Sequence, residues 1–402
     1  MCNVAILGFG TVGSGVFEIL QKNSSIISKR AGEEIVVKYI LDVRDFSKSE
    51  NANLFTKDFD KILNDKDVKV VVETIGGVKY AYNFVKQSLL NAKNVVTSNK
   101  ELVATHGSEL LEIAKHNNVS FMFEASVGGG TPIIMPLHNS LSANNVYEIN
   151  GIVNGTTNFM LTKMADENMS FDEALKLAQN LGYAETIDPS ADVDGIDAGR
   201  KIAILSSIAS GKEVKPNNIN TVGIRNVTVN DIANAKKINS SIKLIAWCKK
   251  DENDNICAGV EPMVIPNNNL LSCVNGVFNA IAVKGDMVGE VVFYGQGAGK
   301  LATASAVVSD IIDGLKNKNV HDTLYWEKTE AVEKDLSDNS PSVYYIAVEN
   351  LKDNALLSGY NIINEKEVAF LTDKIDAKGL LEVKEKINNS GAKILTILKY
   401  LD

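Results

Sequence analysis

Residues 182–201, with the sequence GYAETIDPSADVDGIDAGRK, carry five carboxylates and end on two cations, Arg200 and Lys201. Asp197 and Lys201 are four residues apart at a predicted helix start, so both side chains project from one helix face. A carboxylate that orients and tunes a partly desolvated lysine could perform acid–base chemistry on a carbonyl or an alcohol. The same residues could also form a solvated acidic loop with an ordinary ion pair.

A glycine-rich turn near the N-terminus favours the catalytic hypothesis. An apolar run over residues 4–7 predicts a strand, and the amphipathic segment 16–20 predicts a helix. Between them lies G-x-G-x-x-G, in which Gly8 permits a tight turn, Gly10 lets the backbone approach a pyrophosphate, and Gly13 allows close helix–strand packing. The helix N-terminus would offer N–H groups to the phosphates. The residues expected to bind a dinucleotide here are Gly8, Phe9, Gly10, Thr11, Val12 and Gly13.

The choice of nicotinamide cofactor depends on the end of the next predicted strand, residues 35–41. Asp42 at this position would hold a ribose 2′-OH and favour NAD, whereas Arg44 would favour the 2′-phosphate of NADP. Arg44 and the nearby Lys48 tilt the choice toward NADP, although both could be solvated loop charges. The expected cofactor is therefore NADP or NAD.

Length and charge limit the class of protein. A chain of 402 residues predicts two or three domains, and a net charge of −9 argues against nucleic acid or an anionic membrane surface as the main partner. No apolar run reaches about 18 residues, and the first strand starts too early to leave room for a signal peptide. The four cysteines show no metal-like spacing, which suggests reduced thiols in the cytoplasm.

The first third of the chain alternates strands with helices, which indicates an α/β, doubly wound parallel sheet of Rossmann type. Further strands are expected at 68–73, 94–97 and 119–124, with helices at 80–92 and 102–117. Because ligands bind beyond the carboxyl ends of such strands, four loops become candidates for the site. These loops are 8–13, 73–77, 97–100 and 124–131.

Two of these loops carry side chains with possible chemistry. Lys100 would overhang the nicotinamide end of the cofactor and could hold a polar substrate, or it could be an ordinary surface lysine. Residues 124–131 combine Glu124 with three consecutive glycines, which leaves main-chain carbonyls free to gather around a cation. The same glycines could simply form a hinge into the next domain.

The rest of the chain predicts a second, mixed sheet and a small C-terminal unit. Strands are expected at 145–153, 242–246, 256–261, 280–285 and 287–294, and a small-residue helix at 300–315 should pack back onto the first domain. The tail 343–402 should contain a strand, an irregular segment, a strand at 367–372, a helix at 379–389 and a strand at 393–400.

Rival chemistries fit the chain poorly. A calcium loop aligned on Asp192 and Asp194 places Lys201 where a bidentate glutamate is required. Acyl-enzyme chemistry needs an activated cysteine, and only Cys2, which precedes the first strand, lies near a glycine loop. The four histidines form no metal pattern. Hydride transfer assisted by lysine and carboxylate groups is the hypothesis that uses every loop.

Taken together, seven segments resemble the homoserine dehydrogenase family in its short form, which lacks an aspartokinase domain. They occur in the family's order and cover roughly residues 3–318. The segments are GFGTVGSG, VVETIGG, VVTSNKEL, FEASVGGGTPI, GIVNGTTNFML, LGYAETIDPSADVDGIDAGRKIAIL and YGQGAGKLATASAVVSDI.

The resemblance implies NAD(P)H-dependent interconversion of L-aspartate 4-semialdehyde and L-homoserine, in threonine, methionine and isoleucine biosynthesis. By motif position, Lys201 resembles the family's proton donor and Asp197 its support. Glu185 and Asp192 would bind the amino and hydroxyl groups of the substrate, and Lys100 would contact both substrate and cofactor.

The resemblance also implies further ligands and an assembly. The remaining expected cofactor contacts are Arg44, Thr74, Gly76, Ser98, Lys100, Gly182 and Gly297. A sodium site would consist of Glu124 with the carbonyls of Val127, Gly129 and Thr131. A homodimer or homotetramer is expected.

The expected domains are a dinucleotide-binding domain (1–131 with 297–320), a substrate-binding, catalytic and dimerisation domain (132–296), and a reduced ACT-like tail (341–402). Longer family members carry an ACT domain of βαββαβ order. Here 343–349 could supply its first strand, but 350–359 is short and polar for the first helix, and the usual glycine-bearing effector loop is missing. Threonine feedback through this tail is therefore not expected.

Two hypotheses of different classes follow. The first is the dehydrogenase, which predicts nicotinamide oxidation that depends on aspartate semialdehyde. The second is a non-catalytic dinucleotide-binding regulator on the same scaffold, which predicts cofactor binding without turnover. A regulator would have no use for Lys201 and its carboxylates, so the sequence favours the enzyme.

Overall fold

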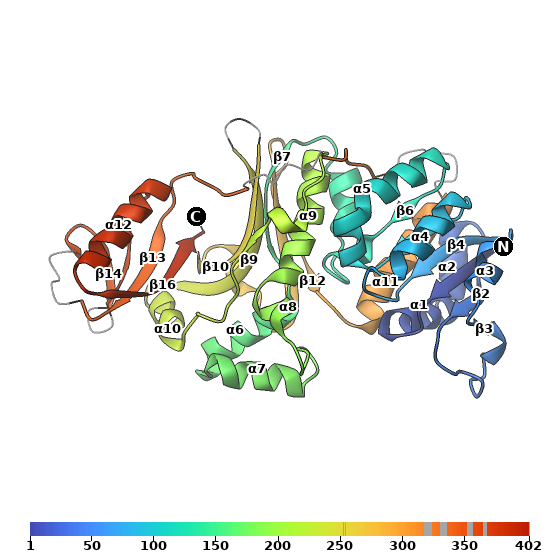
Figure 1. Ribbon diagram of the computed structural model, residues 1–402, viewed down its shortest axis with the longest axis horizontal. Coiled ribbons are helices and arrows are strands. Elements are labelled where there is room, and N and C mark those ends of the chain that lie inside the picture. The colour runs from blue at the N-terminus through green and yellow to red at the C-terminus, as the bar shows by residue number, and fades with distance from the viewer. Residues whose placement is uncertain are drawn as a thin grey trace.

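The computed structural model describes residues 1–251, 253, 255–316, 324–329, 336–351, 357–364 and 368–401. Three parts follow one another along the long axis of the molecule: an N-terminal sheet with its helices, a central part, and a C-terminal part with one helix; the central and C-terminal parts share a second sheet (Figure 1). Within the described ranges, none of the helices has the length and apolar character that would let it cross a membrane.

The N-terminal sheet has six parallel strands in the order β3-β2-β1-β4-β5-β6. Its strands are β1 (Cys2–Leu7), β2 (Ile35–Leu41), β3 (Phe55–Thr56), β4 (Val68–Glu73), β5 (Asn94–Thr97) and β6 (Phe121–Met122). Its helices are α1 (Thr11–Lys22), α2 (Ser24–Ala31), α3 (Phe59–Leu63), α4 (Ala81–Leu90) and α5 (Lys100–His116). This strand order is that of a Rossmann dinucleotide-binding fold, which confirms the predicted doubly wound sheet.

The apolar sequence of β1 explains why both faces of this sheet are covered. Successive side chains of a strand point to opposite faces, and four consecutive residues of β1 are fully buried. Ala5 and Leu7 join the core beneath α4 and α5, whereas Val4 and Ile6 join the core beneath α1 and α11 (Lys300–Lys316). Helix α11 therefore packs on the N-terminal sheet, although about 300 residues of the chain separate it from β1.

A second, mixed sheet runs through the central and C-terminal parts in the order β12-β11-β7-β9-β10-β16-β13-β15-β14, with β8 paired to β10. Its strands are β7 (Val146–Ile152), β8 (Asn220–Thr221), β9 (Ser240–Lys250), β10 (Ile256–Pro266), β11 (Phe278–Gly285), β12 (Gly289–Gln296), β13 (Tyr344–Glu349), β14 (Asn361–Asn364), β15 (Ala369–Leu371) and β16 (Lys393–Tyr400). The accompanying helices are α6 (Gly155–Glu167), α7 (Phe171–Asn180), α8 (Ser190–Val193), α9 (Ile196–Ser210), α10 (Val229–Lys237) and α12 (Ala377–Asn389). The parallel pairing of β10 with β16 joins the tail to the central strands.

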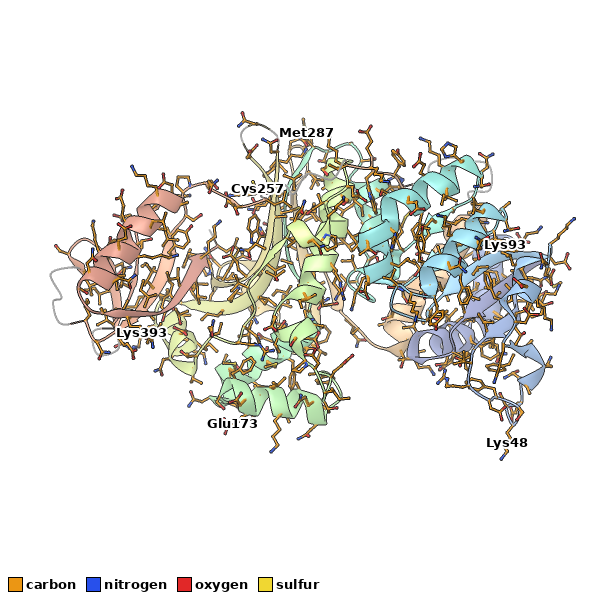
Figure 2. The ribbon with its side chains drawn as sticks, in the orientation of Figure 1. Lys48, Lys93, Glu173, Cys257, Met287 and Lys393 are labelled. Carbon is orange, nitrogen blue, oxygen red and sulfur yellow. The ribbon has the colours of Figure 1, made fainter. Side chains whose placement is uncertain are left out.

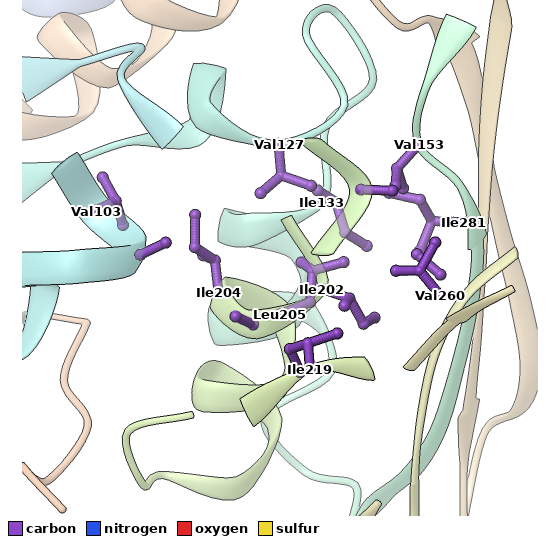
Figure 3. Packing of buried hydrophobic residues seen from close by; sticks show 14 of the residues in the cluster. Val103, Val127, Ile133, Val153, Ile202, Ile204, Leu205, Ile219, Val260 and Ile281 are labelled. Atoms are coloured by element: carbon purple, nitrogen blue, oxygen red, sulfur yellow. The ribbon is translucent and has the colours of Figure 1, made fainter. Parts of the chain in front are cut away.

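Helix α9 packs between the central sheet and α5, as the close-up of the core shows (Figure 3). Ile202 and Leu205 of α9 are buried with Val260 and Ile281 of the sheet and Val103 of α5. These residues belong to a single cluster that continues into the N-terminal sheet. Helix α9 is therefore held by a core that both parts of the molecule share, which helps to fix the position of the residues at its N-terminus.

The structure differs from the predicted elements at a few places. The strand expected at 119–124 is shortened to β6, because the chain enters a 3-10 turn over Glu124–Ser126. The segment expected to be irregular contains β14, and α10 was not predicted. Residue 367, the first of the strand predicted at 367–372, lies outside the described residues, as do 352–356 of the segment 350–359.

The tail strands have a recognisable order. β16-β13-β15-β14 corresponds to the fourth, first, third and second strands of the tail, which is the order of a ferredoxin-like split βαβ fold. Helix α12 packs against β16. The ACT-like assignment of this tail stays a prediction.

Candidate active site

The buried ion pair between Asp197 and Lys201 forms the centre of the candidate site. Both lie on the first turns of α9, with exposed fractions of 4% and 8%. The Lys201 Nζ donates to Asp197 Oδ2 at 2.7 Å and to the main-chain oxygen of Val153 at 2.6 Å. A solvated acidic loop does not fit this pair, because the core of the molecule surrounds it.

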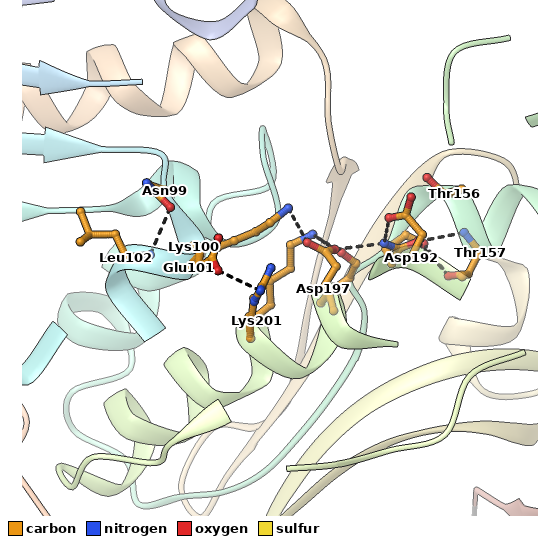
Figure 4. A network of polar contacts seen from close by, with 12 residues as sticks. Asn99, Lys100, Glu101, Leu102, Thr156, Thr157, Asp192, Asp197 and Lys201 are labelled. Atoms are coloured by element: carbon orange, nitrogen blue, oxygen red, sulfur yellow. Dashed lines mark hydrogen bonds and ion pairs between the residues drawn. The ribbon is translucent and has the colours of Figure 1, made fainter. Parts of the chain in front are cut away.

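Lys100 brings a second ammonium group to the same carboxylate. It is the first residue of α5, and only Ser98 and Asn99 separate it from β5; the Asn99 side chain caps this helix by accepting from Leu102 N at 3.1 Å. The Lys100 Nζ forms an ion pair with Asp197 Oδ1 while its side chain is 40% exposed (Figure 4). Asp197 is therefore bound by lysines from two different parts of the chain, one on each oxygen.

Burial and charge set the protonation of this cluster. Burial alone would raise the pKa of Asp197, but the positive charges of Lys201 and Lys100 outweigh it and hold that pKa below its usual range. Burial lowers the pKa of Lys201, and the negative charge of Asp197 opposes this without cancelling it. The cluster thus holds an ionised carboxylate beside a lysine that gives up its proton more readily than an exposed one.

Asp192 joins the cluster through Asn154. The Asn154 Nδ2 donates to Asp192 Oδ1 at 2.8 Å and to Asp197 Oδ2 at 3.0 Å. Burial raises the pKa of Asp192, with the Asn154 hydrogen bond acting in the opposite direction. Asn154 was not among the predicted site residues, although its place in an N-G-T-T-N turn before a helix is a capping signal that the sequence displays.

Glu185 is not brought into this cluster. Glu185 is exposed, and its main-chain oxygen accepts from Gln179 Nε2 at 3.0 Å. The loop that carries Glu185 begins at Gly182 and is tied to α6 by Thr156 Oγ1, which donates to the main-chain oxygen of Tyr183 at 2.7 Å. The substrate-binding role of Glu185 and the cofactor contact at Gly182 stay predictions.

A second ion pair joins α5 to α9 beside the Lys100–Asp197 pair. In this one α9 supplies the cation and α5 the carboxylate. Arg200 Nη2 of α9 contacts Glu101 Oε1 of α5 at 3.0 Å. The consecutive residues Lys100 and Glu101 thus bind Asp197 and Arg200 of the facing helix. No sequence signal identifies this pair, because it depends on how α5 docks on α9.

The glycine turn has the shape that its sequence predicts. Gly8 has a φ of +91°, and a Cβ on Gly13 would lie 2.0 Å from the Gly8 main-chain oxygen, so neither position tolerates a side chain without movement. A Cβ on Gly10 would meet nothing within 4 Å. Helix α1 begins at Thr11 without a side-chain cap, which leaves the amides of Thr11, Val12 and Gly13 suited to a phosphate.

Phe9 has a structural role in this turn. Its N–H donates to Asp42 Oδ2 at 2.8 Å. Its ring contacts those of Phe17, Phe46 and Phe55 at centroid distances of 5.9, 5.6 and 5.1 Å. The aromatic cluster therefore attaches the turn to the loop after β2.

At the end of β2, Asp42 and Arg44 bind each other. Arg44 Nε donates to Asp42 Oδ1 at 2.9 Å and Arg44 Nη2 to Asp42 Oδ2 at 2.8 Å. These hydrogen bonds hold the pKa of Asp42 below its usual range despite partial burial. Lys48 projects from the outer tip of the following loop (Figure 2). Because the acid and the arginine satisfy each other, the geometry leaves the choice between NAD and NADP open.

Glu73 connects the ends of neighbouring strands. It is fully buried at the end of β4, accepts from Thr97 Oγ1 at 2.6 Å and from Ile75 N at 2.7 Å, and burial raises its pKa. Thr74 Oγ1 donates to the Gly8 main-chain oxygen at 2.8 Å. These bonds order the loops that carry the predicted cofactor contacts Thr74, Gly76 and Ser98.

The loop 124–131 is buried except at Gly130, and two of its side-chain hydroxyls have no hydrogen-bond partner among the described residues. The Glu124 carboxylate accepts from the amides of Ile133, Ile134 and Met135 at 2.6, 2.9 and 2.7 Å. These three hydrogen bonds use most of the acceptor capacity of the carboxylate, so a cation would take most of its ligands from main-chain carbonyls such as those of Val127, Gly129 and Thr131. Two buried hydroxyls here, Ser126 Oγ and Thr131 Oγ1, have no hydrogen-bond partner among the described residues, so both are available to contact a bound ligand.

Gly297 lies where the segment after β12 passes close to the loop 124–131. A Cβ on Gly129 would lie 2.3 Å from the Gly297 main-chain oxygen, and a Cβ on Gly297 would lie 2.2 Å from Asn279. Across the described part of the chain, no group of three or more His, Cys, Asp or Glu side chains could hold a metal ion. The carbonyl-based sodium site stays a prediction.

A Rossmann sheet with an open glycine turn, joined to a second domain that presents a buried lysine–carboxylate cluster, defines an NAD(P)-dependent oxidoreductase. Comparison with known proteins gives the family. The family model described as "Homoserine dehydrogenase, NAD binding domain" matches residues 8–124, and the model described as "Homoserine dehydrogenase" matches residues 132–312. The chain belongs to the homoserine dehydrogenase family, which confirms the resemblance drawn from its motifs.

Individual relatives agree. The homoserine dehydrogenase of Bacillus subtilis is 42% identical over 318 residues, which cover 78% of this chain and 73% of the relative. The crystal structure of a homoserine dehydrogenase from Thiobacillus denitrificans has a TM-score of 0.89 at 35% identity and covers 100% of this chain and 98% of its own. A hyperthermophilic archaeal homoserine dehydrogenase in complex with NADPH has a TM-score of 0.66 at 33% identity and covers 78% of this chain and 97% of its own.

Proposed function

We propose that this chain catalyses the reversible NAD(P)H-dependent reduction of L-aspartate 4-semialdehyde to L-homoserine, a step that leads toward threonine, methionine and isoleucine. Family membership supports the substrate pair. The observation that carries the chemistry is the buried contact between Lys201 Nζ and Asp197 Oδ2 at 2.7 Å, next to the carboxyl end of β5. It supplies an ammonium where a carbonyl oxygen needs a proton.

Lys201 is the proton donor in the direction of reduction. Two of its three N–H bonds are used by Asp197 and Val153, and within the described residues the third is left to donate to a substrate oxygen. As the aldehyde oxygen gains negative charge, Lys201 stabilises it and then transfers a proton to it. In the reverse direction the neutral amine removes the proton from the hydroxyl group of homoserine.

The other members of the cluster hold Lys201 and the substrate. Asp197 fixes the ammonium in place and keeps its charge balanced in a site with little water. Lys100, which retains N–H groups beyond its contact with Asp197, adds positive charge toward the substrate. Asp192 binds a polar group of the amino-acid substrate, and Glu185, which lies outside the cluster on an exposed loop, would bind another from that loop.

The glycine turn and the strand ends fit a nicotinamide dinucleotide. The space beside Gly10 and the uncapped N-terminus of α1 would receive the pyrophosphate. Asp42 or Arg44 would contact the adenosine ribose. The nicotinamide, when bound, supplies or accepts the hydride. The archaeal neighbour in complex with NADPH supports NADP as one cofactor.

Three further properties belong to the proposal. A sodium ion would be held by carbonyls of the loop 124–131, where the unpartnered hydroxyls of Ser126 and Thr131 support a ligand. The enzyme would act as a homodimer or homotetramer in the cytoplasm. No disulfide joins its four cysteines, all of which lie in the described part of the chain, three buried and one exposed, as reducing conditions would leave them.

The test is an assay of the wild type and Lys201→Ala with aspartate semialdehyde and with NADPH or NADH. Loss of the ammonium should lower kcat by about 10²–10⁴-fold while cofactor binding persists. Lys176→Ala, which removes an exposed lysine of α7, is the matched control and should keep wild-type rates. Equal rates for wild type and Lys201→Ala would remove Lys201 from the mechanism, and cofactor binding without any turnover would favour the non-catalytic regulator.

A further inference from the structure

We propose that Asn154 is a positioning residue for the reaction, which holds Asp192 and Asp197 in register and thereby sets the proton affinity of Lys201. This inference rests on the proposed function, since it concerns the same acid–base cluster. Asn154 is 5% exposed and lies at the junction between β7 and α6. Its side chain contacts both carboxylates and the N-terminus of α6.

The orientation of the Asn154 amide is fixed by its neighbours. Its Nδ2 faces two carboxylate oxygens, Asp192 Oδ1 at 2.8 Å and Asp197 Oδ2 at 3.0 Å. Its Oδ1 accepts from Thr157 N at 2.9 Å and from Thr157 Oγ1 at 3.0 Å. A flipped amide would place its oxygen against two acids and its NH₂ against a donating amide, so only one orientation satisfies all four contacts.

The turn at 153–154 binds both members of the catalytic ion pair. The Val153 main-chain oxygen accepts from Lys201 Nζ at 2.6 Å, and the Asn154 side chain donates to the carboxylate that neutralises this lysine. The start of α6 therefore locates the ammonium and its counter-charge together. A shift of this turn would move proton donor and carboxylate at once.

Asn154 also keeps two like charges apart in a buried place. Asp197 raises the pKa of Asp192 in addition to the effect of burial, so the two carboxylates repel each other. An NH₂ group between them donates one hydrogen to each and removes part of that repulsion. Without it, Asp197 would turn away from Asp192 and its contact with Lys201 would weaken.

The requirements of the helix do not explain an asparagine here. Serine and aspartate cap a helix N-terminus as well as asparagine does. Serine lacks a second N–H and the reach to two acids, and aspartate would bring a third carboxylate to the cluster. The site, and not the stability of α6, accounts for the residue type.

These differences give two test variants that keep the cap of α6 and change the cluster in opposite directions. Asn154→Ser loosens Asp197 from Lys201, so the pKa of Lys201 should fall. Asn154→Asp adds a negative charge, so that pKa should rise. We expect the alkaline limb of kcat for reduction to move by about one pH unit downward in the first variant and upward in the second. In both, kcat should drop by about 10–100-fold.

A measurement without turnover separates this proposal from the proposed function. NMR titration of ¹³C-methylated lysines, with the Lys201 signal assigned by its loss in Lys201→Arg, reports the same pKa whatever the substrate. Asn269→Ser, which replaces the asparagine cap of the short helix Leu270–Cys273, is the matched control and should change neither readout. If both Asn154 variants show the same Lys201 pKa and the same kinetics as the wild type, the proposal is overturned. An inactive wild type with shifted titrations would overturn only the proposed function.

Discussion

The ammonium groups of Lys100 and Lys201 bind opposite oxygens of one buried carboxylate, although the two lysines lie on different helices and 101 residues apart along the chain. Two positive charges thus face one fixed negative charge, that of Asp197. Both ammonium groups keep N–H groups that Asp197 does not use, and these suit an anion or an oxygen that becomes negative during reaction.

The first prediction concerns pH. Because burial lowers the pKa of Lys201, reduction should lose activity on the alkaline side at a pH below that of an ordinary lysine, about 10.4, and homoserine oxidation should gain activity over the same range. Asp197→Asn removes the counter-charge, so both limbs should move to lower pH and kcat should fall. Profiles of kcat in both directions measure this. Limbs that stay in place in Asp197→Asn would show that another group titrates.

The second prediction separates two glycines of the same turn. Gly13→Ala should destabilise the fold by about 1–3 kcal/mol, because its Cβ would lie 2.0 Å from the Gly8 oxygen. Gly10→Ala meets nothing within 4 Å and has a φ of −75°, so its stability should change by less than about 1 kcal/mol. Gly10→Ala should instead weaken NADPH binding about tenfold or more, because the methyl group occupies the space of the pyrophosphate. Urea unfolding and fluorescence titration check both; unchanged NADPH affinity in Gly10→Ala would place the phosphates elsewhere.

Much of the N-terminal fold could be predicted because its signals are local. β2, β4 and β5 have the predicted bounds, since each is a short apolar run that ends at a polar or glycine-rich loop. β14 escaped prediction because NIIN is short, polar at both ends and half exposed, and α10 because VNDIANAKK has few apolar residues. In both, contacts with the rest of the molecule decide the structure, and sequence periodicity does not display those contacts.

The site was predictable where spacing along one helix sufficed. Asp197 and Lys201 share a helix face, so their contact followed from the sequence. The Asn154 contacts join residues 38 and 43 positions apart, and the Lys100 contact joins residues 97 positions apart. Such contacts depend on how β7, α5 and α9 pack, which no local pattern encodes.

The third prediction concerns cofactor choice. In Arg44→Ala the KM for NADPH should rise about tenfold, because a 2′-phosphate loses its cation, while the KM for NADH should stay or fall as Asp42 becomes free to accept a ribose hydroxyl. Lys48→Ala, at the outer tip of the loop, is the control and should change either KM by less than about twofold. Steady-state kinetics with both cofactors decide the matter. An unchanged ratio of the two KM values in Arg44→Ala would exclude Arg44 from phosphate binding.

The fourth prediction concerns the ion pair between Glu101 and Arg200. Both side chains are about one-third exposed, so the pair should contribute only about 0.2–1 kcal/mol to stability in a double-mutant cycle. Its larger effect should be on catalysis, because it holds α5 against α9 beside Lys100. Glu101→Gln should lower kcat/KM about 2–10-fold, with a loss that shrinks at high salt as the wild-type pair is screened. Glu167→Gln, which breaks the exposed pair with Lys163 on α6, should leave kcat/KM unchanged; an equal effect of both variants would deny the Glu101–Arg200 pair a catalytic role.

The last prediction concerns the attachment of the tail. Asp338 is 4% exposed at its side chain and contacts Lys249 of β9 at 2.6 Å and Lys399 of β16 at 2.5 Å, so one carboxylate connects the central sheet to the C-terminal strand. Despite burial, these lysines hold the pKa of Asp338 below its usual range. A carboxylate with a lowered pKa stabilises the folded state above its unfolded value of about 3.9 and loses that effect as the pH falls through the folded value. Asp338→Asn should therefore lower the free energy of unfolding by about 1–3 kcal/mol at pH 7 and by progressively less below about pH 4.

Chemical unfolding across pH measures this difference in the free energy of unfolding, with Asp373→Asn, which changes an exposed acid of the tail, as the control. A difference that stays constant down to acidic pH would mean that packing, and not the charge on Asp338, holds the tail in place.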